Sequence, residues 1–438
     1  MNAGAMHLVG YISAGPCWHH NGSWRHPESD AVDCMRPERY ETIARILEEG
    51  LFDGVFMVDV QTMFDSYGGT HEANTRQPGQ FWFMEPMQTL AAMARVTSRL
   101  GLAATMSTTL YPPYHIARAF STLDHISNGR AGWNIVTSTN DGEARNFGLD
   151  TFPDKSLRYD LAEEVVEACN KLWESWEPDA IIYDREEGIW ADPAKIRRVD
   201  FEGRFVKTRG PLAAPRSPQT RPVFMQAGSS ERGREFAGRH AEVIFTLQHD
   251  RSHMQAFYQD IKSRVVAHGR PAHHCAVLPA IDVIVGETES IAKEKQAYIN
   301  SLVSPELGVA EISNGIGIDL SNFPLDQPIQ DMEITQGARG VFDVILQGSK
   351  TRNLTLRDAG RAYGESQMTP QIAGTARQIA DHMQSLFEDG CCDGFIVIPS
   401  LSPSGYQQFV KHVVPELQKR GIFRDAYRGT TFREHLQG

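Results

Sequence analysis

The chain lacks long apolar runs, and none of its hydrophobic stretches approaches the roughly 18 residues that a membrane-spanning helix needs. It also lacks clusters of Lys and Arg, and its net charge is −12. A nucleic-acid or acidic-membrane surface requires the opposite charge, so neither partner is expected. The first residues show no basic segment followed by a long apolar core, so we expect no signal peptide and a cytoplasmic protein.

Cysteine is scarce: there are six in 438 residues, and none forms a C-x-x-C pair. The adjacent Cys391 and Cys392 cannot easily form an ordinary disulfide. We therefore expect reduced, mostly buried thiols. No His, Cys and Asp spacing is typical of a metal site either, since His273 and His274 are adjacent and flank a predicted surface helix.

Several catalytic and nucleotide-binding motifs are absent. No G-x-G-x-x-G follows the first apolar run, which argues against a dinucleotide-binding fold. No G-K-[ST] loop is present, which argues against a nucleoside-triphosphate site. No Ser-centred nucleophile elbow and no Ser-His-Asp signature point to hydrolysis.

What the chain does have is a regular alternation of short apolar runs with longer helical patterns. Eight strands alternating with helices predict an α/β protein with a (β/α)8 TIM barrel, and an open doubly wound sheet is the alternative. Helical spacing is clearest from Leu161 to Trp173, and it also links Ile372, Ile379 and Met383. The eight runs are His7–Ser13, Gly54–Val58, Gly101–Ser107, Ala131–Val136, Pro222–Gln226, Glu242–Leu247, Ala276–Val285 and Gly394–Ile398.

Two stretches interrupt this alternation within what we predict to be a single domain over residues 1–438. Residues 177–220 contain Pro, Gly and short polar/apolar alternations, which predict an insertion bearing a hairpin. Residues 301–369 have weaker periodicity, and loops of that length are uncommon unless functional. We expect the second insertion to contain helices and to cover the barrel mouth as a lid.

The most informative stretch is Ser121–Gly148, which runs through an Asn128-Gly129 turn into a strand and then into a small polar cluster at 137–140. In a parallel barrel, reactive groups lie where strands end. Asn134, within this strand, is therefore a candidate for the wall of a ligand site. The alternative is an ordinary helix–turn–strand unit with a polar loop.

Two further candidates lie near strand ends. Asp59 follows the second apolar run, where a carboxylate could accept hydrogen bonds from a ligand; a helix N-cap or solvated turn is the alternative. Thr105 lies on the third strand with its hydroxyl on the same side as that of Ser107. The alternative for Thr105 is a β-former that fills a barrel layer.

The pair Ser229-Ser230 opens a helical segment after the fifth apolar run. A Gly-Ser-Ser turn into a helix offers free N–H groups and hydroxyls to a phosphate, and Arg232 or Arg234 could add charge. An ordinary Ser N-cap explains the pattern equally well.

The N-terminal segment GPCWHHNGSWRH contains His19, and a His near a substrate could transfer a proton because its pKa lies near neutrality. Tyr159 begins the helix after Asn146-Phe-Gly, where a half-buried packing role is the alternative to ligand binding.

Long segments of the chain resemble one known family. They include YPPYHIARAFSTLDHISNGRAGWNIVTSTNDGEARNFG, GPLAAPRSPQ, VFMQAGSSERGREFAGRHAEVIF and VVPELQKRGIFR. They resemble the flavin-dependent monooxygenases of the bacterial-luciferase superfamily, in the branch of nitrilotriacetate, long-chain alkane and dibenzothiophene-sulfone monooxygenases. The Ser-Ala-Gly, His19 and Trp24-Arg-His of the N-terminal segment are most similar to the sulfone-oxidising members.

The resemblance implies a (β/α)8 barrel that uses FMN as FMNH2, delivered by a separate NAD(P)H:flavin reductase, to oxygenate a small organic substrate with O2. We also expect a homodimer or homotetramer. Asp59, Thr105, Tyr159 and Ser229 match the family's flavin contacts, with Ser230 beside them and Asn134 in the same pocket. Lys155 stands where the family commonly has a His, and it could still bond to phosphate.

The departures from the family pattern concern the substrate. Thr139 stands where the alkane enzymes have a His, and the stretch 312–317 lacks the pocket His of the family's long insertion. Two rivals remain: a deazaflavin-dependent oxidoreductase on the same barrel, and a flavin-binding protein without turnover.

The predicted mouth of the barrel is rich in aromatic residues and poor in cations, with Arg76 as the nearest candidate cation. Such pockets favour flat apolar ligands, whereas a polycarboxylate needs converging Lys or Arg. We therefore expect an aromatic substrate, with a sulfone undergoing C–S cleavage as the favoured example and an aminopolycarboxylate or alkane as the alternative. The predicted substrate side chains are Phe56, Phe64, Gln80 and Phe245, with Phe81, Trp82 and Phe83 in the same mouth segments.

Overall fold

The computed structural model describes residues 5–332 and 354–437, and its centre is a closed barrel of eight parallel strands. The strand order is β1, β2, β3, β4, β9, β10, β11 and β13, and pairings between β10 and β11 and between β13 and β1 close the ring. The predicted TIM barrel is therefore confirmed. The strands are β1 His7–Ile12, β2 Gly54–Met57, β3 Gly101–Ser107, β4 Ala131–Val136, β9 Val223–Gln226, β10 Val243–Thr246, β11 Ala276–Val285 and β13 Gly394–Val397.

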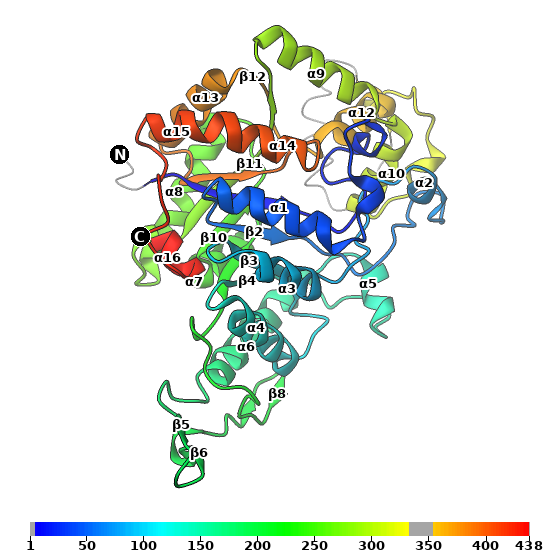
Figure 1. Cartoon of the computed structure of the whole chain (residues 1–438). Coiled ribbons are helices and arrows are strands. Elements are labelled where there is room, and N and C mark those ends of the chain that lie inside the picture. The colour runs from blue at the N-terminus through cyan, green and yellow to red at the C-terminus, as the bar shows by residue number, and fades with distance from the viewer. Residues whose placement is uncertain (1–4, 333–353, 438) are drawn as a thin grey trace.

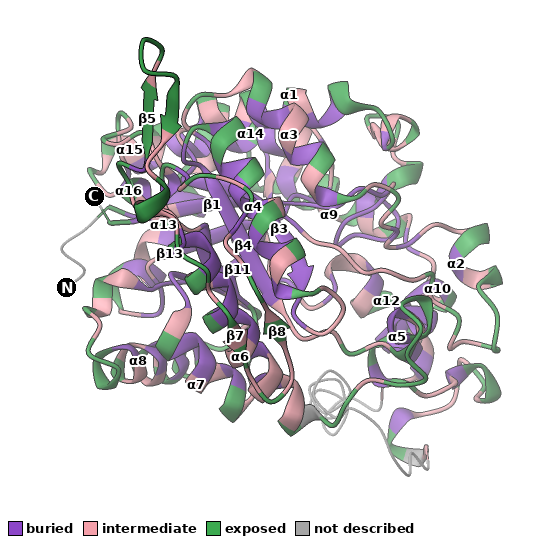
Figure 2. Cartoon of the chain, turned by 90° about the horizontal axis from the view of Figure 1, so that it is seen from below, coloured by how far each residue is buried: buried purple, intermediate pink, exposed green. Residues whose placement is uncertain are grey.

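Helices surround the barrel, and each buries one apolar stripe against the strands (Figures 1 and 2). Helix α6 follows β4 and shows the rule: Val165, Val166, Cys169 and Leu172 recur at helical spacing and are all fully buried. The surrounding helices are α1 Pro37–Glu49, α3 Pro86–Val96, α4 Pro113–Ser127, α6 Lys155–Trp173, α7 Glu231–His240, α8 Arg251–Ala267, α9 Glu289–Ser301, α13 Ala376–Glu388, α14 Ser404–Gln408 and α15 Val414–Lys419.

One predicted helix position is wrong. Ile372 lies in strand β12, Gln371–Gly374, which pairs with the second half of β11. The following helix α13 begins only after Thr375, whose side chain forms a capping box with Gln378. The apolar spacing was compatible with a helix that includes Ile372, but the capping box starts the helix only at Ala376.

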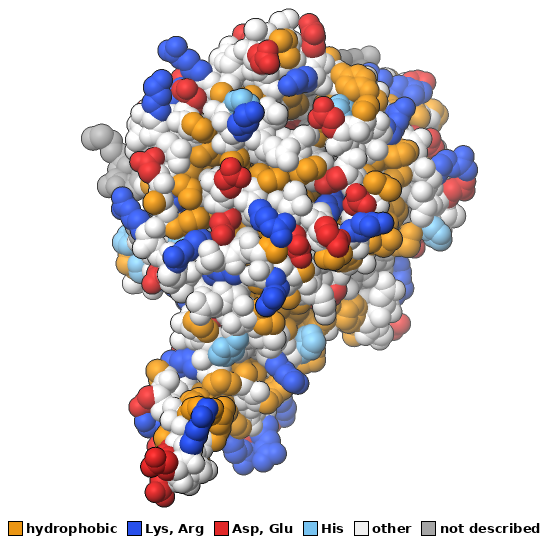
Figure 3. All heavy atoms as spheres, viewed as in Figure 1, with side chains coloured by type: hydrophobic (Ala, Val, Ile, Leu, Met, Phe, Trp, Pro, Cys, Tyr) orange, Lys and Arg blue, Asp and Glu red, His pale blue; other side chains and the backbone are white. Residues whose placement is uncertain are grey.

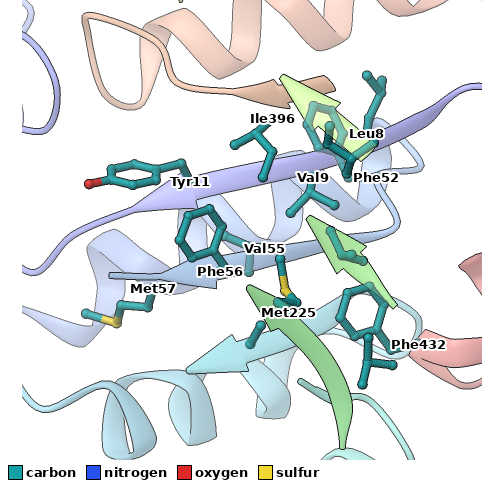
Figure 4. Packing of buried hydrophobic residues seen from close by; sticks show 14 of the residues in the cluster. Leu8, Val9, Tyr11, Phe52, Val55, Phe56, Met57, Met225, Ile396 and Phe432 are labelled. Carbon is teal, nitrogen blue, oxygen red and sulfur yellow. The ribbon is translucent and has the colours of Figure 1, made fainter. Parts of the chain in front are cut away.

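The amino-terminal end of the barrel is sealed by the C-terminal helix α16, Phe432–Gln437. The ring of Phe432 is fully buried beneath the starts of the strands, among the core residues in Figure 4. A Cβ added to Gly101 at the start of β3 would lie 2.4 Å from this ring, so the close approach requires glycine there. Any ligand site must therefore open at the opposite, carboxyl end of the strands.

Segment 177–220 projects from the barrel as an arm (Figures 1 and 3). It holds two antiparallel hairpins, β5 Ile181–Asp184 with β6 Ile189–Ala191, and β7 Phe201–Glu202 with β8 Lys207–Thr208.

In segment 301–369, helices α10 Pro305–Ile316 and α12 Leu356–Ser366 pack on each other over their own apolar cluster. Two shorter helices, α2 Glu72–Arg76 and α5 Asp141–Asn146, lie in loops that follow β2 and β4. Part of the predicted lid, residues 333–353, lies outside the described residues.

Candidate active site

A cavity of about 720 Å³ lies at the carboxyl ends of the barrel strands. Loops after β1, β2, β4, β9 and β10 form its wall together with helix α12. Ten of the predicted site residues line it, although they are spread over more than 200 positions of the sequence. These ten are His19, Phe56, Asp59, Phe64, Gln80, Thr105, Asn134, Tyr159, Ser229 and Phe245.

Thr105 and Asn134 are register partners on the neighbouring strands β3 and β4. Both side chains are buried, and the Asn134 amide Nδ2 donates a 2.9 Å hydrogen bond to Thr105 Oγ1. The Thr105 hydroxyl therefore keeps its own proton for a ligand. This pair forms a polar floor between apolar barrel layers.

Asp59 lies two residues beyond the end of β2 and accepts a hydrogen bond from the Gln61 side chain. Burial and repulsion by Glu85 and Glu143 raise the pKa of Asp59 to about 7. Glu143 also lines the cavity, and burial raises its pKa as well. This side of the cavity therefore offers one carboxyl group, that of Asp59, that can hold a proton near neutral pH, and a second whose pKa is shifted in the same direction.

The opposite side is built by the turn 227–230 at the start of helix α7. Ser229 is exposed and lines the cavity, beside Gly228 and the hydroxyl of Tyr159. A Cβ added to Gly228 would lie 2.6 Å from that hydroxyl, so the turn and Tyr159 approach closely. Free N–H groups at a helix start together with two hydroxyls form a site suited to an anion.

Ser230, the second residue of the predicted pair, lies at the start of α7 and bonds to the side chain of Tyr159. The Ser230 hydroxyl caps α7 by accepting a 3.1 Å hydrogen bond from Gly233 N–H, and Ser230 is not among the residues that line the cavity. Arg232 pairs with Asp160, and Arg234 pairs with Glu231 and Asp260, so these cations are engaged on the surface of the helix. The backbone of Lys155 begins α6, but its side chain lies outside the described side chains.

Two buried polar atoms in the cavity wall have no partner within the described structure. One is the acceptor Gln226 Oε1 at the end of β9, and the other is the donor Trp82 Nε1. Leaving such atoms unsatisfied costs roughly 1–3 kcal/mol each. A ligand with both acceptors and donors, as a flavin has in its ribityl chain and ring, would satisfy them.

Aromatic rings form a third part of the wall. Phe56 and Phe245 lie 5.8 Å apart between ring centroids, and Phe64 meets Trp82 edge-to-face at 5.3 Å. Phe81 and Phe83 do not line the cavity, contrary to the prediction; they stack on each other at 5.1 Å. In this extended segment alternate side chains point in opposite directions, which places Trp82 in the cavity and its neighbours outside it.

His19 lies against Tyr11, with ring centroids 4.6 Å apart, and its Nδ1 forms a 2.7 Å hydrogen bond with Thr369 Oγ1. Burial lowers the pKa of His19 to about 3. The imidazole is therefore neutral at physiological pH, and a neutral imidazole can offer a ligand a hydrogen bond but not the proton of an imidazolium acid.

Among the side chains that the structure describes, which exclude that of Lys155, no Lys or Arg lines the cavity. Arg76, the nearest cation expected from the sequence, instead pairs with Glu72 on the exposed helix α2. The cavity thus combines apolar rings, neutral hydroxyls and amides, and protonatable carboxyls.

Sequence reasoning missed several lining residues. Tyr363, Gln367 and Met368 come from the end of α12 in the second insertion, and His249 follows β10. They carry no motif of their own, and only the packing of the insertion on the barrel brings them to the site.

A comparison with protein families finds that residues 16–393 match the model of the luciferase-like monooxygenases. The chain belongs to the luciferase-like monooxygenase family. It is thus a flavin-dependent monooxygenase, and its cofactor is FMN in the reduced form.

Curated relatives match along nearly their whole length. The chain is 46% identical to a dibenzothiophene-sulfone monooxygenase of Rhodococcus erythropolis (strain XP), over 98% of this chain and 96% of that one. It is 40% identical to nitrilotriacetate monooxygenase component A of Aminobacter aminovorans, over 95% and 93%.

A solved structure, riboflavin lyase with modified FMN and its substrate riboflavin, superposes with a TM-score of 0.89 at 31% identity, covering 99% of this chain and 96% of that one. These similarities confirm the predicted family.

Other sequence predictions concern the cysteine thiols, membrane-spanning helices and metal-binding groups. All six cysteines are buried and none forms a disulfide. None of the helices in the described ranges is long and apolar enough to cross a membrane. No group of three or more His, Cys, Asp or Glu in those same ranges is arranged to hold a metal ion.

Proposed function

We propose that this monooxygenase oxygenates an uncharged aromatic or heteroaromatic substrate, with an aromatic sulfone that undergoes C–S cleavage as the favoured example. The observation that carries this proposal is the lining of the cavity. Phe56, Phe64, Trp82 and Phe245 supply flat apolar surface, and no cation accompanies them among the described lining residues. A pocket of this kind favours flat apolar ligands with a few polar contacts.

The alternative within the family is an aminopolycarboxylate, the type of compound named for one relative. Burying several carboxylates without cations is costly, and Asp59 and Glu143 would add repulsion. The lining therefore favours the uncharged substrate. The 46% identity to a sulfone monooxygenase supports the same choice.

For FMN, we propose that Tyr159, Ser229 and the N–H groups that open α7 hold the phosphate, with Lys155 nearby. Thr105, Asn134 and Asp59 would contact the ring, and Gln226 would accept from the ribityl hydroxyls. When bound, reduced FMN supplies the reactivity toward O2. The protein holds the ring in place, and the aromatic wall excludes water from the reacting face.

The polar groups at the other end of the cavity would orient the substrate. His19 and Tyr11 place a neutral imidazole and a phenol hydroxyl in the wall, and the imidazole offers an Nε2–H donor in the tautomer whose Nδ1 accepts from the Thr369 hydroxyl. Sulfone oxygens are hydrogen-bond acceptors, so donors of this kind would hold them without a charge. We propose that His19 acts in catalysis through such a hydrogen bond.

A competition experiment tests the substrate class. The protein, FMN, NADH and a flavin reductase would be mixed with equal amounts of dibenzothiophene sulfone and metal-free nitrilotriacetate. We expect loss of the sulfone with little loss of the carboxylate. Rapid loss of nitrilotriacetate alone would show that the cavity lining has been misread.

Two other functions can be separated from this one by binding and turnover. A deazaflavin-dependent enzyme would bind deazaflavin in preference to reduced FMN, and a flavin-binding protein without turnover would bind FMN but consume no substrate. Binding of oxidised FMN, reduced FMN and deazaflavin, followed by the competition above, distinguishes all three.

We also propose a cytoplasmic homodimer or homotetramer. The projecting arm supports self-association, because hairpin β5–β6 exposes large apolar side chains: Ile182 is 49% exposed, Tyr183 52% and Trp190 62%. A lone two-stranded hairpin is marginally stable in water, so a partner surface would stabilise it. Sedimentation of the wild type beside a Trp190→Ser variant tests this, and a monomeric wild type would refute it.

A further inference from the structure

Glu311, on helix α10 of the second insertion, is a buried carboxyl group that ties together three parts of the chain. It is 3% exposed. Its Oε1 accepts a 3.0 Å hydrogen bond from Gln80 N–H, in the loop after β2. Its Oε2 accepts from Asn21 Nδ2 at 2.8 Å, in the loop after β1, and from Gln367 Nε2 at 3.0 Å, at the end of α12.

The charge of this carboxyl group is not balanced by a cation. Glu311 forms no ion pair with any Lys, Arg or His in the described ranges, and three neutral donors are its partners. The titratable groups near it are Tyr11, Cys17 and Tyr363, and burial keeps all three protonated. Burial also raises the pKa of Glu311 to about 7. An uncompensated buried carboxylate costs stability, so a purely structural role is a poor explanation for it.

Two of the three partners of Glu311 line the active-site cavity, whereas Glu311 itself and Asn21 do not. The two that do are Gln80 and Gln367. The Gln367 amide nitrogen is already engaged, since it donates to Glu311 Oε2 and also contacts Asn21 Oδ1 at 3.5 Å. The Gln80 amide nitrogen donates to Trp18 O at 3.2 Å. In both amides the oxygen is therefore the atom left for a ligand.

All three partners of Glu311 donate to its oxygens, so it acts here as an acceptor, and an acceptor turns the NH2 end of a neighbouring amide toward itself. We propose that Glu311 is a positioning residue that fixes the Gln367 oxygen toward the cavity, so that this wall accepts a hydrogen bond from a hydroxyl or N–H group on an aromatic substrate. This inference rests on the proposed aromatic substrate, and it adds that the substrate carries a hydroxyl or N–H group as a hydrogen-bond donor.

A Glu311→Gln variant separates this role from simple packing. The backbone N–H of Gln80 cannot turn, so the new amide must present its oxygen there and its NH2 to Gln367. The amides of Asn21 and Gln367, which both donate to Oε2 in the wild type, must then rotate, and Gln367 places its own NH2 in the cavity. The variant should thus convert an acceptor in the wall into a donor while preserving volume.

The test uses the full-length protein with biphenyl and its 2-, 3- and 4-hydroxy derivatives as probes, with binding measured by calorimetry. We expect wild-type protein to bind at least one hydroxybiphenyl about 5-fold more tightly than biphenyl, the ratio that one hydrogen bond of about 1 kcal/mol provides. Glu311→Gln should lose this preference and keep its affinity for biphenyl within about 3-fold.

Asp282→Asn is the matched control. Asp282 is also fully buried, accepts hydrogen bonds from Ser400 N–H at 2.9 Å and Gln371 Nε2 at 3.1 Å, has a pKa raised by burial to about 6, and does not line the cavity. It should keep the hydroxyl preference. Gln367→Met, which removes the acceptor directly, should lose it even if Glu311→Gln does not fold.

The inference is overturned if wild-type protein shows no hydroxyl preference, if Gln367→Met retains one, or if Asp282→Asn loses it as well. These outcomes do not depend on the sulfone. A failed sulfone competition together with a lost preference in Glu311→Gln would refute the proposed sulfone and leave the role of Glu311 supported.

Discussion

At the scale of single residues, Tyr159 and Ser229 offer the clearest test of the proposed phosphate site, because both line the cavity beside the start of α7. We predict that Ser229→Ala combined with Tyr159→Phe weakens FMN binding on the order of 100-fold, since hydrogen bonds to a charged group contribute about 1.5–3 kcal/mol each. Riboflavin lacks the phosphate and should weaken by less than about 5-fold. Fluorescence titration with both ligands measures the ratio.

Thr288→Ala is the matched control for that double variant, because Thr288 caps helix α9 and does not line the cavity. The Thr288 hydroxyl accepts a 3.2 Å hydrogen bond from Ile291 N–H. Its loss should lower the free energy of unfolding by about 1 kcal/mol and leave the FMN-to-riboflavin affinity ratio unchanged. Equal weakening of FMN and riboflavin in the double variant would place the phosphate elsewhere.

Asp59 should make the stability of the protein depend on pH. Its pKa rises from the ordinary 3.8 to about 7 in the folded protein, so the folded state binds the proton more tightly than the unfolded state does. Between those values the contribution of Asp59 to stability falls as pH rises. Asp59→Asn removes this loss, and it should raise the unfolding free energy by on the order of 2 kcal/mol at pH 8.

The same Asp59→Asn variant should gain little at pH 4, where the carboxyl of the wild type is already protonated in the folded state. Urea unfolding at the two pH values checks this difference. A gain at pH 4 as large as that at pH 8 would mean that burial does not disfavour the charge.

At the scale of elements, helix α16 determines whether the barrel floor is closed. Phe432 is fully buried against the glycines that start the strands, and the cavity lies at the other end of the barrel. Phe432→Ala should therefore cost about 3–5 kcal/mol of stability while FMN affinity at 25 °C changes little.

Phe83→Ala is the control for this change, because Phe83 is 48% exposed. Its substitution should cost less than about 1 kcal/mol. If Phe432→Ala and the wild type unfolded at the same urea concentration, α16 would not be part of the folded core.

At the scale of the whole molecule, the sequence contains no dinucleotide-binding motif that would let the protein use NADH by itself. The first strand leads into GPCWHH rather than a glycine-rich dinucleotide turn, and one relative is named as component A of its system. We predict that NADH, FMN and dibenzothiophene sulfone give no product with this protein alone. Addition of an NAD(P)H:flavin reductase should start product formation. Chromatography, which measures the amount of sulfone remaining, monitors the reaction.

Efficient product formation without a reductase would contradict that prediction. A control with photochemically reduced FMN in place of NADH and the reductase should restore a single turnover. This control separates a missing electron supply from an inactive protein.

The sequence by itself determined the barrel and part of the lining of its cavity. Apolar runs of strand length alternating with amphipathic helices specify the eight strands, because local periodicity reflects which side of each element is buried. Asp59, Thr105, Asn134 and Ser229 could be found because they stand at or near the ends of those strands, where a parallel barrel gathers its loops.

Only the tertiary structure decided the rest. Tyr363 and Gln367 enter the cavity because helices α10 and α12 fold back over the barrel, a long-range packing that leaves no periodic signal near those residues. Which of the three residues 81–83 lines the cavity depended on how this extended segment is rotated about its own axis. The neutral state of His19 depended on its burial. The rotation of the segment around Trp82 and the burial of His19 are properties of the assembled molecule rather than of any local stretch of sequence.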